Sequence, residues 1–514
     1  MSKVTPEVLI AGSTLTPAEV VLVARHGAPA VLAPDTMRRL ARDRAVVDDV
    51  VNRRVPAYGV TTGLGSRSSH ALAREELAEF SVRTVRGRAN AVGEPLPTEV
   101  VRAAMLARVN GIAAGGSGVQ PAVAELLVAM LNEGVHPLVP EVGSIGASDL
   151  NQMAHVGLVV IGEGHAEVGG ELIDGATALR RRGLAPVALG PKDGLVLCGA
   201  SPLAAGHGAL VVADAATGVV LAQAVAALTF EGFRGNTSPF DARVQAVRAA
   251  PGQADAARGL LALLAGGELT DAGNARRMQD PISLRCVSQV HGALHAALTF
   301  LTDALEPELN GSGDNPIVLA DSGEILSTGN FHTPGLALGC DTLALALCQS
   351  ASLSVMRTAR LLSPATSGIP ANATPHGPER SGLASLLKTA QALAAEIRFL
   401  STPVSTDPRY GADGVEDDST NAAFGARRLT TILARVRYVL AVEAVVAAQA
   451  VELARPESVG AGPELLLRAV REVVAPLDED RPFGDDVERV AREVLGSAEL
   501  QAALRHITGD PGAA

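Results

Sequence analysis

The spacing of apolar residues in the second part of the chain predicts long α-helices. After about residue 200, apolar side chains recur every three or four positions, with little interruption by Gly or Pro. This is the period of an α-helix with a buried face. The stretches with 20 or more residues of this character are 205–233, 283–306, 335–362, 380–402 and 421–454. Helices of this length and apolarity must cover one another, so we predict a helical bundle.

The first part of the chain has a different pattern. Gly and Pro interrupt residues 1 to about 190 often enough to predict short helices and loops. A helix pair is expected over 99–134, broken by the Gly-rich residues 115–118. We therefore predict a mainly α fold, with a loop-rich N-terminal domain at 1–195 and a long-helix bundle and C-terminal helical region at 196–514. A single hydrophobic core rarely grows to 514 residues, which also favours two regions.

Composition and charge argue against several classes of partner. The chain is rich in Ala, Leu and Val, with 53 Gly and no Trp, which suits helices packed through small side chains. Its net charge of −12 argues against nucleic acid and anionic membranes, since both would favour a basic surface. The apolar run from Ala209 to Phe230 carries Asp214 and much Ala and Gly. We expect it to be a buried helix rather than a membrane span.

The cysteines and the N-terminus indicate a reducing compartment. The cysteines are Cys198, Cys286, Cys340 and Cys348. They lack CxxC spacing, and the first residues lack the features of a signal peptide, so we expect buried thiols in a cytoplasmic protein. His291 and His295 have a helical spacing that could suit zinc, but no acidic third ligand accompanies them. No metal site is therefore expected.

Six segments carry candidate chemistry, and those at 310–316, 327–332 and 409–418 are polar, Gly-rich loops between the predicted helices, where function is usually located. The six are Tyr58-Gly-Val-Thr-Thr-Gly-Leu-Gly65, Gly143-Ser-Ile-Gly-Ala-Ser-Asp-Leu-Asn-Gln-Met-Ala-His155, Gln279-Asp-Pro-Ile-Ser-Leu-Arg-Cys286, Asn310-Gly-Ser-Gly-Asp-Asn-Pro316, Ser327-Thr-Gly-Asn-Phe-His332 and Arg409-Tyr-Gly-Ala-Asp-Gly-Val-Glu-Asp-Asp418. Taken singly, several have plain structural interpretations: a Gly-rich turn around Tyr58, an Asx turn before Pro316, and a solvated acidic run at 416–418.

In this order, the segments resemble the aromatic amino acid lyase family, which includes histidine and phenylalanine ammonia-lyases. The resemblance covers nearly the whole chain. It implies a histidine ammonia-lyase-like fold and a homotetramer whose active sites combine residues from several subunits. Tyr58 looks like the family's catalytic base, since a tyrosine can take a proton from carbon in a site of positive potential. Glu416 looks like the glutamate that contacts the substrate amine or side chain.

The resemblance also implies a substrate-binding set. Arg285, in the segment that begins at Gln279, would hold a substrate carboxylate through two parallel hydrogen bonds. Asn315 would assist it, and Phe331 would lie beside the family's prosthetic group. Arg88 stands where relatives commonly have His or Phe against the substrate ring. A cation there suggests a second anionic or hydrogen-bonding end of the substrate, although a surface or ion-paired arginine is an equal alternative.

Three departures from the family pattern concern its electrophile, the 4-methylidene-imidazol-5-one (MIO) ring that forms from Ala-Ser-Gly. Here Ala147-Ser148 runs directly into Asp149, and a β-carbon at that position hinders the ring closure that glycine permits. Ile282 replaces a second tyrosine. The segment 195–201 lacks the asparagine that normally hydrogen-bonds the ring. We therefore expect no cofactor, although a ring closed from Ala-Ser-Asp stays open as an alternative.

These features lead to three hypotheses. The first is an MIO-independent lyase in which Tyr58 drives elimination or addition on a carboxylate-bearing, amino acid-like substrate. Such an enzyme would need a better leaving group than ammonia, as in ergothionases, which resemble ammonia-lyases, lack the ring and expel trimethylamine. The second is an ammonia-lyase or aminomutase with an Ala-Ser-Asp ring. The third is a non-catalytic paralogue.

Overall fold

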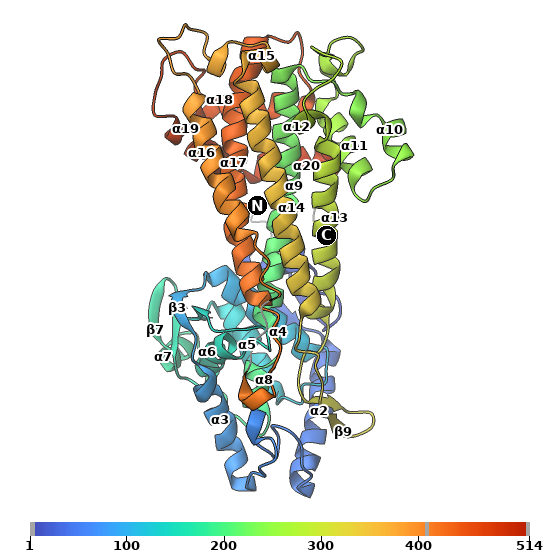
Figure 1. Cartoon of the computed structure of the whole chain (residues 1–514). Helices are drawn as coiled ribbons and strands as arrows, with labels where there is room; N and C mark the ends of the chain where they lie inside the picture. Colours follow the sequence, from blue (N-terminus) through green and yellow to red (C-terminus); the bar gives the residue numbers. More distant parts are fainter. Residues whose placement is uncertain (1–5, 407–410, 510–514) are drawn as a thin grey trace.

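The longest helices run side by side along the molecule. The computed structural model describes residues 6–406 and 411–509, which are mainly helical (Figure 1). The helices of the bundle are α9 (Pro202–Phe233), α13 (Val287–Asn310), α14 (Pro334–Leu361), α16 (Ala384–Leu400) and α17 (Ala422–Ala454), of which all but α16 exceed 20 residues. They confirm the predicted helical stretches and the mainly α fold.

Helix α16 is shorter than predicted, with 17 residues. It begins after Gly382, whose φ of +58° belongs to the left-handed region and interrupts a helix. It ends at Leu400, three residues before Pro403, and a proline disfavours helical backbone in the residue before it. The helical spacing of apolar residues therefore extends beyond both ends of the helix itself.

The N-terminal region lies at one end of the long helices (Figure 1). Its helices are α1 (Pro17–His26), α2 (Pro34–Arg53), α3 (Leu77–Arg88), α4 (Thr98–Ala113), α5 (Pro121–Glu133), α6 (Leu150–Val160), α7 (Gly175–Arg181) and α8 (Asp193–Cys198). Helices α4 and α5 confirm the predicted pair. Between them, Gly115, Gly116 and Gly118 all have positive φ, which explains the break.

Short strands also occur, and the sequence pattern did not predict them. Strand β1 (Val8–Ile10) pairs in parallel with β2 (Ala30–Leu32). The other pairings are antiparallel. Strand β3 (Val92–Pro95) pairs with β5 (Pro140–Val142), and β8 (Ile317–Leu319) pairs with β9 (Glu324–Leu326). Strand β6 (His165–Val168) lies between β4 (His136–Pro137) and β7 (Glu171–Asp174) and pairs with both. Strands of two to four residues are too short to display an alternating pattern.

Smaller helices cover the opposite end of the bundle (Figure 1). They are α10 (Ala242–Val247), α11 (Gln253–Leu264), α12 (Ile282–Arg285), α15 (Pro364–Ser367), α18 (Ala461–Val473), α19 (Phe483–Arg489) and α20 (Ala498–Thr508). The segment from Asp193 to Phe233 and helix α14 are long and apolar enough to cross a membrane, but most of each is buried within the described part of the chain.

Helix α9 is the centre of the bundle, and nearly all of its residues are buried. Small residues set its distance from its neighbours, since a β-carbon at Gly206 would lie 2.5 Å from the backbone of Ala103 in α4. Polar contacts add specificity. Glu443 of α17 receives hydrogen bonds of 2.5 and 2.8 Å from Arg357 of α14 and one of 2.7 Å from Thr229 of α9. The core is therefore continuous from helix to helix.

Candidate functional site

The N-termini of several helices meet where the bundle joins the N-terminal region. The residues just before α6, α9, α14 and α17 are hydrogen-bonded to one another. Asp149 N–H donates to Ala200 O at 2.8 Å, and Asn421 N–H donates to Ile145 O at 3.0 Å. Ala147 and His332 form an isolated antiparallel bridge. Helix N-termini carry partial positive charge, so their convergence favours a bound carboxylate or a developing negative charge.

A cavity of about 290 Å³ opens beside these helix ends. Its wall includes Tyr58, Arg88, Ala147, Ser148, Asn315, Phe331 and Glu416. These residues come from widely separated parts of the chain, and all were singled out from the sequence. The structure brings them together, while their chemical roles remain predictions. Leu64, Leu150 and Leu195 supply the apolar part of the wall. The cavity is thus mixed in character, as small-molecule sites usually are.

Tyr58 is held by the loop that contains it. Ala57 O accepts backbone N–H groups from Val60 and Thr61 at 3.1 and 3.0 Å, which closes a tight turn around the tyrosine. Gly59 is required in this turn, since its φ is +62° and a β-carbon would lie 2.6 Å from the Leu195 side chain. The Tyr58 hydroxyl oxygen accepts the Gly65 N–H at 3.1 Å. A donor at this oxygen is suited to stabilise negative charge on it.

Asn315 is oriented through its neighbours. The preceding residue, Asp314, is buried and accepts two hydrogen bonds from Arg108, at 2.7 and 3.2 Å. The Asn315 Oδ1 accepts the Thr328 N–H at 3.0 Å. Its Nδ2 is therefore the atom left to donate to a ligand in the cavity. The sequence motifs did not include Arg108, and an arginine directly after the apolar run 103–107 of α4 was the available signal.

Ser148 and Asp149 have a constrained backbone. Ser148 has a φ of +65°, an uncommon value for a residue with a side chain. The Asp149 carboxylate is fully buried and accepts hydrogen bonds from Ser144 Oγ at 2.7 Å and from Ala204 N–H at 2.9 Å. Burial raises the pKa of Asp149, and these hydrogen bonds oppose the rise. Since Ala204 lies in the first turn of α9, Asp149 stabilises that helix terminus.

Two neighbouring arginines at the end of α3 have different environments. Arg86 pairs with Glu163 at the surface, which raises the pKa of Arg86. Arg88 is half-buried and lines the cavity, and no described residue forms a hydrogen bond or ion pair with it. Glu416 is also half-buried, and its backbone pairs with Gly411. Residues 407–410, and so the beginning of the predicted loop at 409–418, lie outside the described residues.

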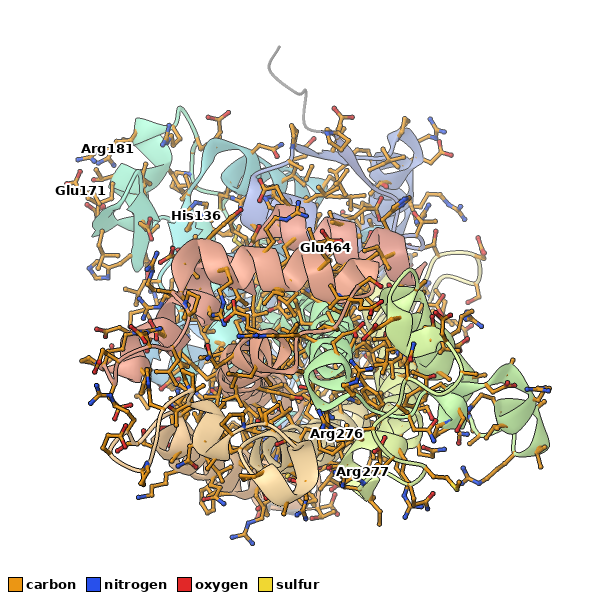
Figure 2. The ribbon with its side chains drawn as sticks, turned by 90° about the horizontal axis from the view of Figure 1, so that it is seen from above. His136, Glu171, Arg181, Arg276, Arg277 and Glu464 are labelled. Carbon is orange, nitrogen blue, oxygen red and sulfur yellow. The ribbon has the colours of Figure 1, made fainter. Side chains whose placement is uncertain are left out.

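Arg285 and Gln279 lie at the opposite end of the bundle. Arg285 precedes α13, and the far end of α13 reaches the helix termini beside the cavity. The 24 residues of α13 span about 36 Å at 1.5 Å per residue. Figure 2, seen from this opposite end, shows Arg276 and Arg277 near the end of α9, where the Arg277 guanidinium lies 5.3 Å from the ring centre of Phe233. Within one chain, these two predicted binding residues are therefore remote from the cavity.

Known proteins resemble this chain over almost its full length. The sequence model of the aromatic amino acid lyase family matches residues 15–472. Histidine ammonia-lyase from Symbiobacterium thermophilum is 40% identical over 499 residues, which cover 97% of this chain and 98% of the relative.

Solved structures agree. Ergothionase, the ergothioneine-degrading enzyme from Treponema denticola, has a TM-score of 0.92 and 28% identity, covering 97% of this chain and 99% of its own. Tyrosine aminomutase from Streptomyces globisporus has a TM-score of 0.92 and 32% identity, covering 98% and 99%. The order of the motifs, the helical fold and these similarities show that the chain belongs to the aromatic amino acid lyase family.

Proposed function

We propose that this protein is a carbon–nitrogen lyase that acts on an amino acid-like carboxylate by Tyr58-assisted elimination or addition, without the MIO electrophile. The observation that carries the proposal is the environment of Asp149, at the position where the family's ring closes through a glycine nitrogen. The comparisons support an enzyme of the histidine ammonia-lyase type. Independence of the ring and the identity of the leaving group are our inference.

The contacts of Asp149 do not fit a ring closed from Ala147, Ser148 and Asp149. Ring closure would bond the Asp149 nitrogen to the Ala147 carbonyl carbon and remove its hydrogen. The hydrogen bond to Ala200 O, 2.8 Å long, would then be lost. The carboxylate on the same residue is already held by Ser144 and by the first turn of α9. Because both the backbone and the side chain of Asp149 are held, its nitrogen is poorly placed to move toward the Ala147 carbonyl carbon.

The described lining of the cavity also has no asparagine side chain from the segment 195–201. Gly199 contributes to the wall in the segment where relatives have the ring-binding asparagine, and glycine has no side chain to donate. Ile282, which replaces the second tyrosine, lies in α12, at the other end of the chain's bundle. These substitutions support a reaction that does not require stabilisation of an electrophile.

In the proposed reaction, the Tyr58 oxygen takes a proton from the substrate carbon next to the one that bears nitrogen. The electrons of that carbon–hydrogen bond form the new double bond, and the leaving amine takes the electrons of the carbon–nitrogen bond. Without an electrophile, the nitrogen must leave easily, which favours a quaternary ammonium over a primary amine. The similarity to ergothionase supports this substrate class. The converging helix N-termini would favour the anionic transition state.

Arg88, Asn315 and Glu416 would bind the two ends of the substrate. Arg88 has no hydrogen-bond or ion-pair partner among the described residues, and such an arginine in a cavity provides a site for a carboxylate or another strong acceptor. Asn315 would donate through Nδ2, and Glu416 would face a cationic or donor group, with Phe331 against the apolar part. The family role of Arg285 and Gln279 then requires a second copy of the chain. Apolar residues next to Gln279 and Arg285 are exposed in the single chain, since Met278 is 90% and Ile282 63% exposed. Such exposed apolar side chains support an interface between copies of the chain, and we propose a homotetramer.

The proposal is tested by intact mass and by activity on the same preparation. The polypeptide should have the mass of its sequence, without the loss of two water molecules that ring formation causes. It should convert an α-trimethylammonium amino acid to an unsaturated acid faster than the corresponding primary amine. Loss of two waters, together with faster turnover of the primary amine, would overturn the proposal.

The second candidate is an ammonia-lyase or aminomutase with an Ala-Ser-Asp ring. It is favoured by the 40% identity to histidine ammonia-lyase across almost the entire chain. The same two measurements distinguish it, because it predicts a dehydrated mass and activity on histidine or an aromatic amino acid. A non-catalytic paralogue would show neither activity and would keep its binding role after the Arg285→Ala substitution.

A further inference from the structure

A second cavity adjoins the first at Ala200, just before α9. Its volume is about 420 Å³, and Ala200 lines both cavities. Its wall is formed by the end of α13, the Gly-rich residues 311–313, Ser201, Asn330 and His332, with Arg108 at one side. The sequence motifs did not identify this cavity.

Glu308 is the acidic group of this cavity. It is half-buried near the end of α13, and no described residue donates a hydrogen bond to its carboxylate. Burial and the nearby charge of Asp149 raise the pKa of Glu308 to about 7. A carboxylate without a partner in a partly desolvated cavity is costly, unless a ligand supplies the missing donor.

Two further features favour a cation. The hydroxyl oxygen of Ser312, on the same wall, is buried and has no hydrogen-bond partner in the described part of the chain. The cavity is also lined by Pro307 and Gly311 at the C-terminal end of α13, where helix carbonyl groups carry partial negative charge. Arg108 does not offset this, because its guanidinium is already paired with Asp314.

We infer that this second cavity binds a small ammonium-type cation, with Glu308 as its counter-ion and Ser312 as an additional acceptor. A cation with N–H donors satisfies both unpaired groups. A transition-metal ion fits less well, because no group of three or more His, Cys, Asp or Glu residues that could hold a metal occurs in the described ranges. The volume also accommodates several non-hydrogen atoms rather than a bare ion.

The position of this site relates it to the first cavity. Ala200 lines both cavities. Ser201 lines the second cavity, and its hydroxyl donates a hydrogen bond of 2.8 Å to the backbone oxygen of Phe331, which lines the first. An amine released in the first cavity would therefore meet the cation site in the adjoining cavity. That connection rests on the proposed function, whereas binding of the cation does not.

The test measures cation binding by the complete protein through its thermal stability. Methylammonium chloride is titrated against sodium chloride at equal ionic strength and pH 8, and the melting temperature is recorded by calorimetry. At ten times the dissociation constant, we expect a saturable rise of about 1–2 °C over sodium. The rise should be smaller at pH 6, because Glu308 is then mostly protonated. The other titratable or charged groups that face it are Asp149, Arg108 and His332, and the last lies 3.2 Å from Asp418.

Three variants make the test specific. Glu308→Gln should abolish the methylammonium effect, whereas Glu306→Gln, on an exposed residue of the same helix, should retain it. Gly329→Leu should weaken it by filling the cavity, since a β-carbon at Gly329 meets no atom within 4 Å and the residue lines the wall. An equal rise in wild type and Glu308→Gln, or no difference between methylammonium and sodium in the wild type, would overturn the inference. Neither result depends on turnover, so the proposed function can fail separately.

Discussion

The Asp314→Asn substitution tests whether the buried pair with Arg108 stabilises the protein and positions Asn315. The two side chains are 3% and 1% exposed, and their closest contact is 2.7 Å. Asparagine has nearly the same shape but removes the charge. Arg108 would then be a buried cation without a counter-ion among the described residues. Lys192, whose pKa burial lowers to about 8, would lose one of the three negative charges that oppose this lowering, with Asp193 and Asp43 remaining.

The expected cost is large. Removing one partner of a buried ion pair typically destabilises a protein by about 3–5 kcal/mol. In a chain of this length, this should lower the melting temperature by roughly 3–5 °C. The substitution should also raise KM for the substrate more than it lowers kcat, because Asn315 follows Asp314 directly and would lose its orientation. Calorimetry and steady-state kinetics on the same preparation measure both effects.

The matched control is Asp321→Asn. Asp321 pairs with Arg42, but these side chains are 95% and 62% exposed. Exposed pairs contribute about 0–1 kcal/mol, so the control should hardly change the melting temperature. If Asp314→Asn were as stable as the control, the buried pair would not have the role assigned to it. A large loss of stability with unchanged KM would refute only the orientation of Asn315.

Three other predictions concern the site and the core. Tyr58→Phe should lower kcat by about 10²–10⁴-fold without unfolding the protein. The control Tyr438→Phe removes a surface hydrogen bond to Glu488 and should leave kcat unchanged. Full activity of Tyr58→Phe would exclude the proposed base. Arg88→Met should raise KM for substrates with a second anionic end, whereas the control Arg86→Met should not. Equal effects of the two substitutions on KM would argue against contact between Arg88 and the substrate. Burial raises the pKa of Glu231 from an ordinary value of 4.5 to about 7. Because the folded protein then binds the Glu231 proton more tightly than the unfolded chain, the free energy of unfolding falls as pH rises from 4.5 to 7. Glu231→Gln should remove about 3 kcal/mol of this pH dependence, measured by unfolding at pH 4.5 and 7.5, and an unchanged pH profile would contradict the shift.

Much of the bundle could be predicted because helical periodicity is a local property. Side chains three or four residues apart lie on the same face of a helix, so α9, α14 and α17 could be recognised without knowledge of their neighbours. The short strands could not, because a strand such as β4, with two residues, depends on its partner rather than on its own pattern. The length of α16 was overestimated because the local backbone at Gly382 outweighed the apolar period.

The candidate site was only partly accessible from the sequence. Tyr58, Asn315, Phe331 and Glu416 could be selected because they occur within recognisable segments in a fixed order. Glu308 could not, since nothing in its local sequence distinguishes it from any other glutamate near a helix end. Its raised pKa comes from burial and from the charge of Asp149, which is far away in the chain.

The sequence alone therefore determined the helical architecture, the family and the loss of a glycine after Ser148. Tertiary structure decided what that loss means for Asp149, whose nitrogen and carboxylate are held by Ala200, Ser144 and Ala204. It also decided that Arg285 lies a helix length from the cavity. The physical reason is that helix formation follows from neighbours along the chain, whereas burial, charge and hydrogen bonding depend on residues that only folding brings together.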